Sequence, residues 1–124
     1  MSVWKELRSE FVVPIYDEHV VVVVTTDVDA SICKINPEYD GPQFAACVLW
    51  PHVAGEYFVL VHVRDVEDLS VVGHELFHLT VRMAHRNGFR FDVDNHEAYA
   101  FLQGFLSKEV CTRLRDLANQ LPES

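Results

Sequence analysis

The segment His74-Glu75-Leu76-Phe77-His78 decides how this 124-residue chain is interpreted. On a helix, residues four apart lie about 40° apart around the axis and about 6 Å along it, so both imidazoles project from one face. A single metal ion can bridge two such rings, and the glutamate beside the first histidine points into the same cleft. The spacing therefore predicts a Zn²⁺ site with His74 and His78 as ligands and Glu75 as general base.

The residues around this segment predict a helix over about 66–86. Apolar residues recur there at helical spacing without an intervening proline: Leu69, Val72, Leu76, Leu79 and Met83. Asp65 or Asp68 is a candidate N-cap, and Asn87-Gly88 is a stop signal. The two histidines are thus expected in mid-helix.

A third metal ligand has to come from elsewhere in the chain, because a catalytic zinc takes three protein ligands and keeps one position for water. The metzincin extension requires a glycine three residues after the second histidine and another histidine three residues further on. Those positions hold Val81 and Ala84, which excludes this pattern.

Glu97 is the better candidate for the third ligand. It follows His78 after 18 intervening residues, in the first turn of a second helical pattern with Asp94 or Asn95 as N-cap. That length of chain can finish one helix and return a second one antiparallel across it. If Glu97 is only a first-turn carboxylate, Asp94 or His96 would replace it.

The order His74-Glu75-x-x-His78 and then Glu97 resembles the gluzincin branch of the zincin metallopeptidases. Residues 95–106 also resemble short zincin-like proteins of bacteriophages and prophages, in which a Glu-Ala-(Tyr/Phe) helix follows the HExxH helix. The resemblance covers about residues 45–108. Thermolysin-like enzymes place an aspartate four residues after the ligand glutamate, where this chain has Phe101, so another residue must orient the histidine.

The ligand set implies hydrolysis of peptide bonds. Two neutral imidazoles and one carboxylate leave the ion with a charge near about +1, enough to lower the pKa of its water from about 16 toward 7. Glu75 would take the proton and deliver it to the leaving amine. Tyr99, His96 and His85 are candidates to stabilise the oxyanion. The substrate would be a peptide or protein.

A second class of function stays open beside the peptidase. In it the chain is a catalytically inactive zincin-fold module for binding or phage assembly, and the metal only braces the domain.

Composition indicates the number of domains, the cellular location and the classes of partner to expect. A chain of 124 residues with 49% hydrophobic residues predicts one domain, residues 1–124. Three cysteines without a CxxC pair, and the lack of an apolar signal core, favour a cytosolic protein of a bacterial or phage-infected cell. A net charge of −9 argues against nucleic acid as a partner, and the valine run is too short to span a membrane.

The order of the predicted elements favours an α+β fold, a small twisted sheet with two or three helices packed on one side. A short helix is expected within 1–12, and residues 27–42 are expected to be irregular. The predicted strands are 19–26, which is central, and 44–50 and 56–63, which form a hairpin; the predicted helices are 66–86, 95–106 and 108–120, the last two divided near Ser107. By resemblance, strand 44–50 or 57–63 would pair with an extended substrate.

Overall fold

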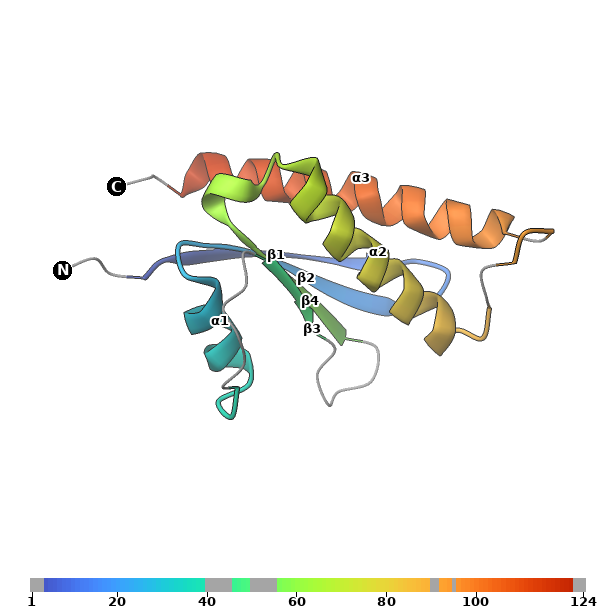
Figure 1. The fold of residues 1–124 in the computed structure, drawn as a ribbon, viewed down its shortest axis with the longest axis horizontal. Helices are drawn as coiled ribbons and strands as arrows, with labels where there is room; N and C mark the ends of the chain where they lie inside the picture. Colours follow the sequence, from blue (N-terminus) through green and yellow to red (C-terminus); the bar gives the residue numbers. More distant parts are fainter. Residues whose placement is uncertain (1–3, 40–45, 50–55, 90–91, 95, 122–124) are drawn as a thin grey trace.

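The computed structural model describes residues 4–39, 46–49, 56–89, 92–94 and 96–121 of the chain. The fold is mixed α and β, with a four-stranded sheet and helices on both of its faces (Figure 1). The elements in chain order are β1 (Glu6–Val13), β2 (Glu18–Thr25), α1 (Val28–Ile35), β3 (Ala46–Leu49), β4 (Glu56–His62), a 3₁₀ turn (Val63–Asp65), α2 (Leu69–Arg86) and α3 (Glu97–Gln120).

The strands lie in the order β1-β2-β4-β3, so β3 is at one edge of the sheet. β2 and β4 are parallel, and the two outer pairs are antiparallel. The predicted central strand is confirmed as β2, and the last two predicted strands do pair antiparallel, with Val48 opposite Val59. The loop predicted to join them falls on residues 50–55, outside the described residues.

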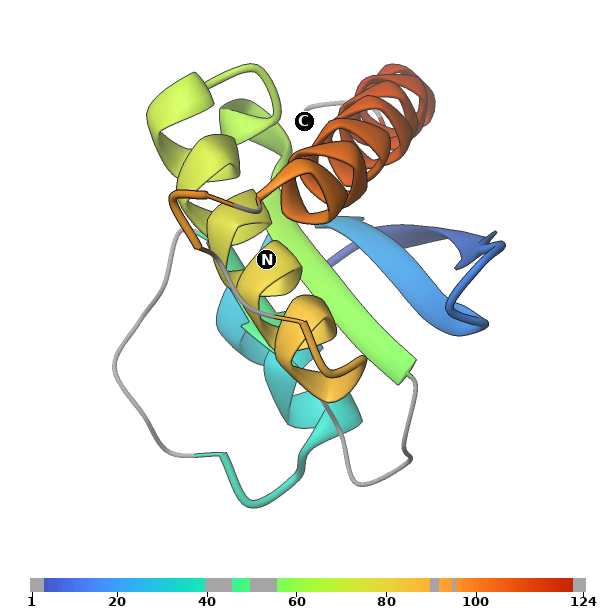
Figure 2. The ribbon, with the colours of Figure 1, turned by 90° about the vertical axis from the view of Figure 1, so that its right-hand side faces the viewer.

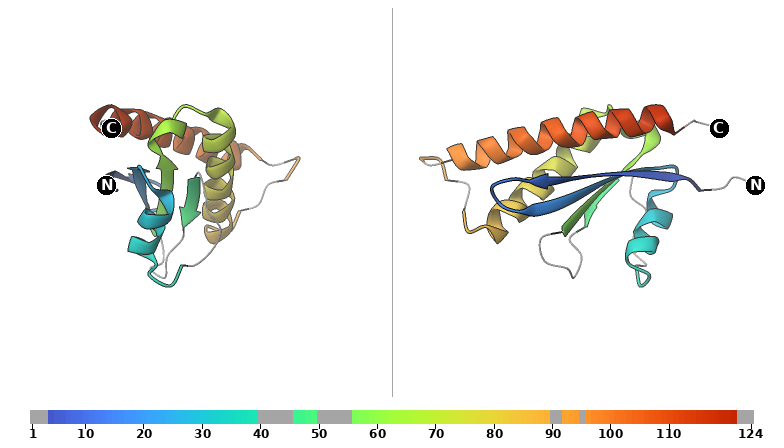
Figure 3. Two further views of the ribbon diagram at one scale, coloured as in Figure 1. Left: turned by 60° about the vertical axis from the view of Figure 1, so that its left-hand side comes forward. Right: turned by 180° about the vertical axis from the view of Figure 1, so that it is seen from behind.

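The valines of β2 are buried on both faces of the sheet, and they supply two separate cores. Val20, Val22 and Val24 pack with α2 and α3, whereas Val21 and Val23 pack with Ile32 of α1. Figures 1 and 3 show α1 alone below the sheet and the two long helices above it. The expectation of helices on one side is therefore correct for α2 and α3 and wrong for α1.

The segment 27–42 was predicted to be irregular, but it contains α1. Asp27 caps this helix by accepting a hydrogen bond from the backbone N–H of Ala30. The helix buries Val28 and Ile32 against the sheet, four residues apart on one face. Tertiary burial stabilises a helix of eight residues that is too short to form reliably on its own.

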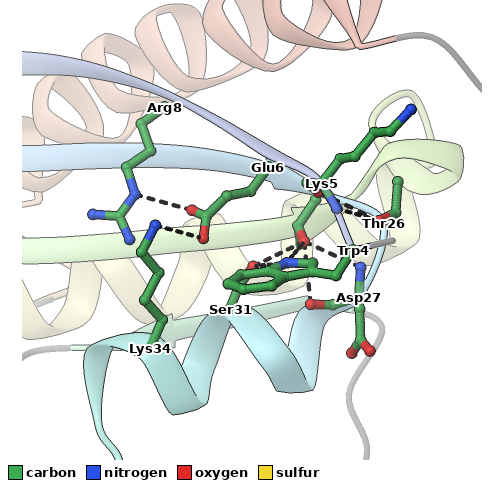
Figure 4. A network of polar contacts seen from close by, with 9 residues as sticks. Trp4, Lys5, Glu6, Arg8, Thr26, Asp27, Ser31 and Lys34 are labelled. Carbon is green, nitrogen blue, oxygen red and sulfur yellow. Dashed lines mark hydrogen bonds and ion pairs between the residues drawn. The ribbon is translucent and has the colours of Figure 1, made fainter. Parts of the chain in front are cut away.

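The predicted helix within residues 1–12 is wrong, because residues 6–13 form β1. Phe11 and Val13 alternate toward the core, while the polar residues at the start of the strand face outward or pair with side chains. The N-terminal end is fixed by Trp4, whose indole N–H lies 3.0 Å from Thr25 Oγ1 and 3.1 Å from Ser31 Oγ (Figure 4). Glu6 pairs with both Arg8 and Lys34 beside it.

The predicted break near Ser107 is also wrong, since α3 runs through it without interruption. Its buried residues recur every three or four positions on both sides of Ser107: Tyr99, Leu102, Leu106, Val110, Leu114 and Leu117. One continuous apolar stripe packs best as one straight helix. Among the described residues, neither α3 nor any other helix has the length and apolarity to cross a membrane.

A buried ionic contact joins the C-terminal end of α2 to the sheet. Glu18 of β2 is almost fully buried, and its Oε1 accepts hydrogen bonds from Arg86 Nε at 2.7 Å and Asn87 Nδ2 at 3.2 Å. α2 ends at this point, with Asn87 as C-cap and Gly88 at φ 81°. The helix carrying the two histidines is thus held against the sheet at its C-terminal end.

Candidate metal centre

His74 and His78 lie together on the exposed side of α2. Their Nε2 atoms are 3.1 Å apart, and the ring centroids are 4.7 Å apart with the planes at 77°. Two ligands of a tetrahedral zinc, each with a bond of about 2.0–2.1 Å, are about 3.3 Å apart. The pair therefore fits two corners of a zinc site with very little movement.

At this separation the two nitrogens can form one hydrogen bond, in which the tautomers of the two rings decide which one donates. One Nε2–H then donates to the unprotonated Nε2 of its neighbour. A divalent metal would take the place of that proton, since metal ligation requires the neutral, unprotonated nitrogen. In the absence of metal, the hydrogen bond thus joins the same two nitrogens that a bound ion would bridge.

The rest of α2 positions this pair through its buried stripe. Val72, Leu76, Leu79 and Met83 pack into the core, as the spacing predicts. Leu69 belongs to the same sequence pattern but is 79% exposed, because it is the first residue of the helix and extends beyond the sheet. The packed stripe leaves the histidines on the solvent side.

Glu75 is half-buried between α2 and the edge strand β3. Its carboxylate accepts a hydrogen bond from the backbone N–H of Val48. Burial raises the pKa of this carboxyl, and His74, His78 and the Val48 amide each oppose the rise. Residue 75 lies about 100° around the helix from His74, so the carboxylate sits between the imidazole pair and the sheet edge.

Glu97, the predicted third ligand, is the exposed first residue of α3. It lies about 160° around that helix from Tyr99, which is buried against α2. Within the described part of the chain, no three His, Cys, Asp or Glu side chains come close enough together to hold a metal. Glu97 therefore does not join the histidine pair in this conformation, and its role as ligand stays a prediction.

The two alternative ligands, Asp94 and His96, are exposed residues just before α3. The backbone N–H of Asp94 donates to Asp92 Oδ1 at 2.8 Å in a tight turn. His96 occupies the N-cap position of α3 in place of the predicted Asp94 or Asn95, and its side chain makes no capping hydrogen bond. Asn95 itself lies outside the described residues.

Tyr99 and His85, the two remaining candidates for the oxyanion donor, line one open hollow between α2 and α3. The hollow has a volume of about 520 Å³, and its other lining residues are Phe77, Val81, Ala84, Phe89 and Gln103. Burial raises the pKa of the Tyr99 phenol, which keeps it protonated and able to donate. The two helices that form the hollow cross obliquely above the sheet (Figures 1 and 2).

Two features of the site were missed from the sequence. The Val48 amide that holds Glu75 is a backbone group, and no residue type marks it. Phe77 and Val81 could have been found, because they are apolar yet lie off the core stripe and on the histidine side of α2.

Comparison with known proteins found no match among family models, curated proteins or solved structures.

Proposed function

We propose that this chain is a zinc-dependent peptide-bond hydrolase of the cytosol, with a peptide or protein as substrate. His74 and His78 hold the ion, and Glu75 is the general base. Glu97 is the proposed third ligand, and it would have to approach the pair from the exposed position that it occupies here. The observation that supports this most strongly is the 3.1 Å separation of the two Nε2 atoms on the helix face that also carries Glu75.

Glu75 has the position and environment that a general base needs. Its half-buried carboxylate is a stronger base than one in water, because burial raises its pKa. The Val48 N–H donates to this carboxylate, and in the proposed mechanism the carboxylate takes a proton from a water molecule beside the imidazoles. The same group then delivers that proton to the amine nitrogen of the cleaved bond. A Zn²⁺ ion, when bound, supplies the Lewis acidity that polarises the carbonyl.

The edge strand gives a place for the substrate chain. Of the two strands considered from sequence, β4 is interior and paired on both sides, whereas β3 is at the edge of the sheet next to Glu75. An extended peptide added beside β3 would hydrogen-bond to that strand through alternate residues and run past Glu75 and the histidine pair. Tyr99 is the proposed oxyanion donor, since its phenol stays neutral.

The alternative function is that of a catalytically inactive zincin-fold module for binding or assembly. The exposure of the two histidines supports this alternative. Both histidine rings are on the open side of α2, and no described element forms a second wall above them. A metal that only braced the fold would make no use of Glu75. The two proposed functions therefore differ in whether they require Glu75.

Replacement of that residue tests the proposal. We expect Glu75→Gln to keep the fold and the bound zinc and to lose hydrolysis of a generic peptide substrate by about 10²–10⁴-fold, the usual contribution of a general base. Glu67→Gln is the matched control, because Glu67 is exposed, precedes α2 and lies 4.0 Å from Arg115 of α3. Hydrolysis at the wild-type rate by zinc-loaded Glu75→Gln would remove the proposed mechanism, in which Glu75 is the base. No hydrolysis by the zinc-loaded wild type would remove the peptidase proposal and leave the binding module.

A further inference from the structure

We infer that the α2–α3 hollow receives a large apolar side chain of the substrate, with an aromatic one preferred. This inference rests on the proposed function, because it names the class of peptide that the histidine site would act on. Three observations carry it: the apolar lining of the hollow, its position relative to the histidines, and the neutral polar groups among its described lining residues.

The lining is mostly aromatic and aliphatic. Phe77 and Phe89 contribute rings, Val81 and Ala84 contribute methyl groups, and Tyr99 contributes a ring that is itself buried. Phe77 is 55% exposed and Val81 37%, and with the rings of Phe89 and Tyr99 they line one contiguous apolar surface, which is more informative than single exposed apolar residues. A volume of about 520 Å³ lies within the range of about 300–1,000 Å³ typical of ligand sites.

The hollow adjoins the histidine pair on α2. Phe77 and His78 are in ring contact, with centroids 6.5 Å apart. Val81 and His85 continue the helix face of His74 and His78, each within about 20° of His74 around the axis. Glu75 faces β3 on the other side of the pair. A peptide held at the pair can therefore place one side chain in the hollow while its backbone stays beside Glu75.

The polar groups at the hollow suit a neutral occupant. Among the lining residues in the described part of the chain there is neither a carboxylate nor a lysine or arginine, and the polar ones are His85, Gln103 and the Tyr99 phenol. A charged side chain entering it would lose water without gaining an opposite charge. An aromatic side chain, which buries about 150–250 Å², would cover the rings of the lining and leave its own edge near the polar groups.

The test measures binding without cleavage. The full-length wild-type chain, loaded with zinc, is titrated with N-acetyl-phenylalaninamide and with N-acetyl-aspartamide, and amide shifts are followed by NMR. We expect the phenylalanine probe to bind at least about tenfold more tightly and to shift the residues that line the hollow. Val81→Asp should weaken its binding by about tenfold or more, and Gln103→Glu, a change at an exposed position, should weaken it in the same direction. Leu69→Asp, an exposed apolar residue of the same helix outside the hollow, should leave binding unchanged.

Equal affinities for the two probes, or shifts that map elsewhere, would overturn the inference. So would unchanged binding in a folded Val81→Asp or Gln103→Glu protein. A separate cleavage assay on a mixed peptide library distinguishes this failure from that of the proposed function. Hydrolysis without preference for large apolar residues would reject the hollow and keep the peptidase, whereas specific binding in the hollow without any hydrolysis would reject the peptidase and keep the hollow.

Discussion

Glu75 and Tyr57 show how burial changes the acid–base chemistry of single side chains in this fold. Burial raises the pKa of both groups. For Glu75 the neighbouring imidazoles and the Val48 amide oppose that rise, and the carboxylate remains available as a base. For Tyr57 the Glu18 carboxylate adds to the rise, because its charge and the hydrogen bond from the phenol both favour the neutral form.

Tyr57 gives a pH prediction at this scale. Its pKa is raised from 10.0 to about 12 in the folded protein, so its contribution to stability is complete below pH 10 and is lost as the pH rises through about 12. In an absorbance titration of the four tyrosines, the step near pH 12 should disappear in Tyr57→Phe. Burial also raises the pKa of Tyr99, so Tyr99→Phe is titrated beside it and should keep the step near pH 12. Tyr39→Phe is the control and should retain it. A late step that survives in Tyr57→Phe would contradict the assignment.

At the scale of elements, the sequence correctly predicts the helices and strands whose apolar periodicity is long and regular. β2, α2 and the pairing of β3 with β4 follow from periodicity, and Asp68 and Asn87 cap α2 as the residue types indicate. β1 was mistaken for a helix because its first half is exposed edge strand, where charged residues obscure the alternation that Phe11 and Val13 follow. α1 was missed because its stability comes from burying Ile32 against the sheet, on Val21 and Val23 of β2 and on Phe58 and Leu60 of β4, and local periodicity does not show this contact.

The continuity of α3 across Ser107 makes a prediction for that helix. Ser107→Pro should lower the free energy of unfolding by about 3 kcal/mol or more, because proline removes a backbone hydrogen bond and clashes with the preceding turn. Ser107→Ala should change it by less than about 1 kcal/mol, since alanine favours helix and the position is only half-buried. Urea unfolding of the two variants measures both. Tolerance of the proline would mean that two helices meet at this position.

At the scale of the whole molecule, the fold brings one edge strand, one helix face and one apolar hollow to the same place. The mixed sheet places β3 at its edge, the core stripe of α2 turns the histidines outward, and α3 closes the far side of the hollow. The sequence identified His74, Glu75 and His78, since four-residue spacing on a helix determines their relation. It could not place Glu97 relative to them, because that depends on the rotation of α3, which is determined by burial of Tyr99 and Leu102.

Zinc content is the measurement that tests the central claim most directly. The protein, purified without added metal, is compared by elemental analysis with His78→Ala and with His85→Ala. His85 lies on the same helix face, about two turns beyond His78. We predict about one zinc per chain in the wild type and in His85→Ala, and none in His78→Ala. A folded wild-type protein that carries no zinc and binds none when it is supplied would contradict the account.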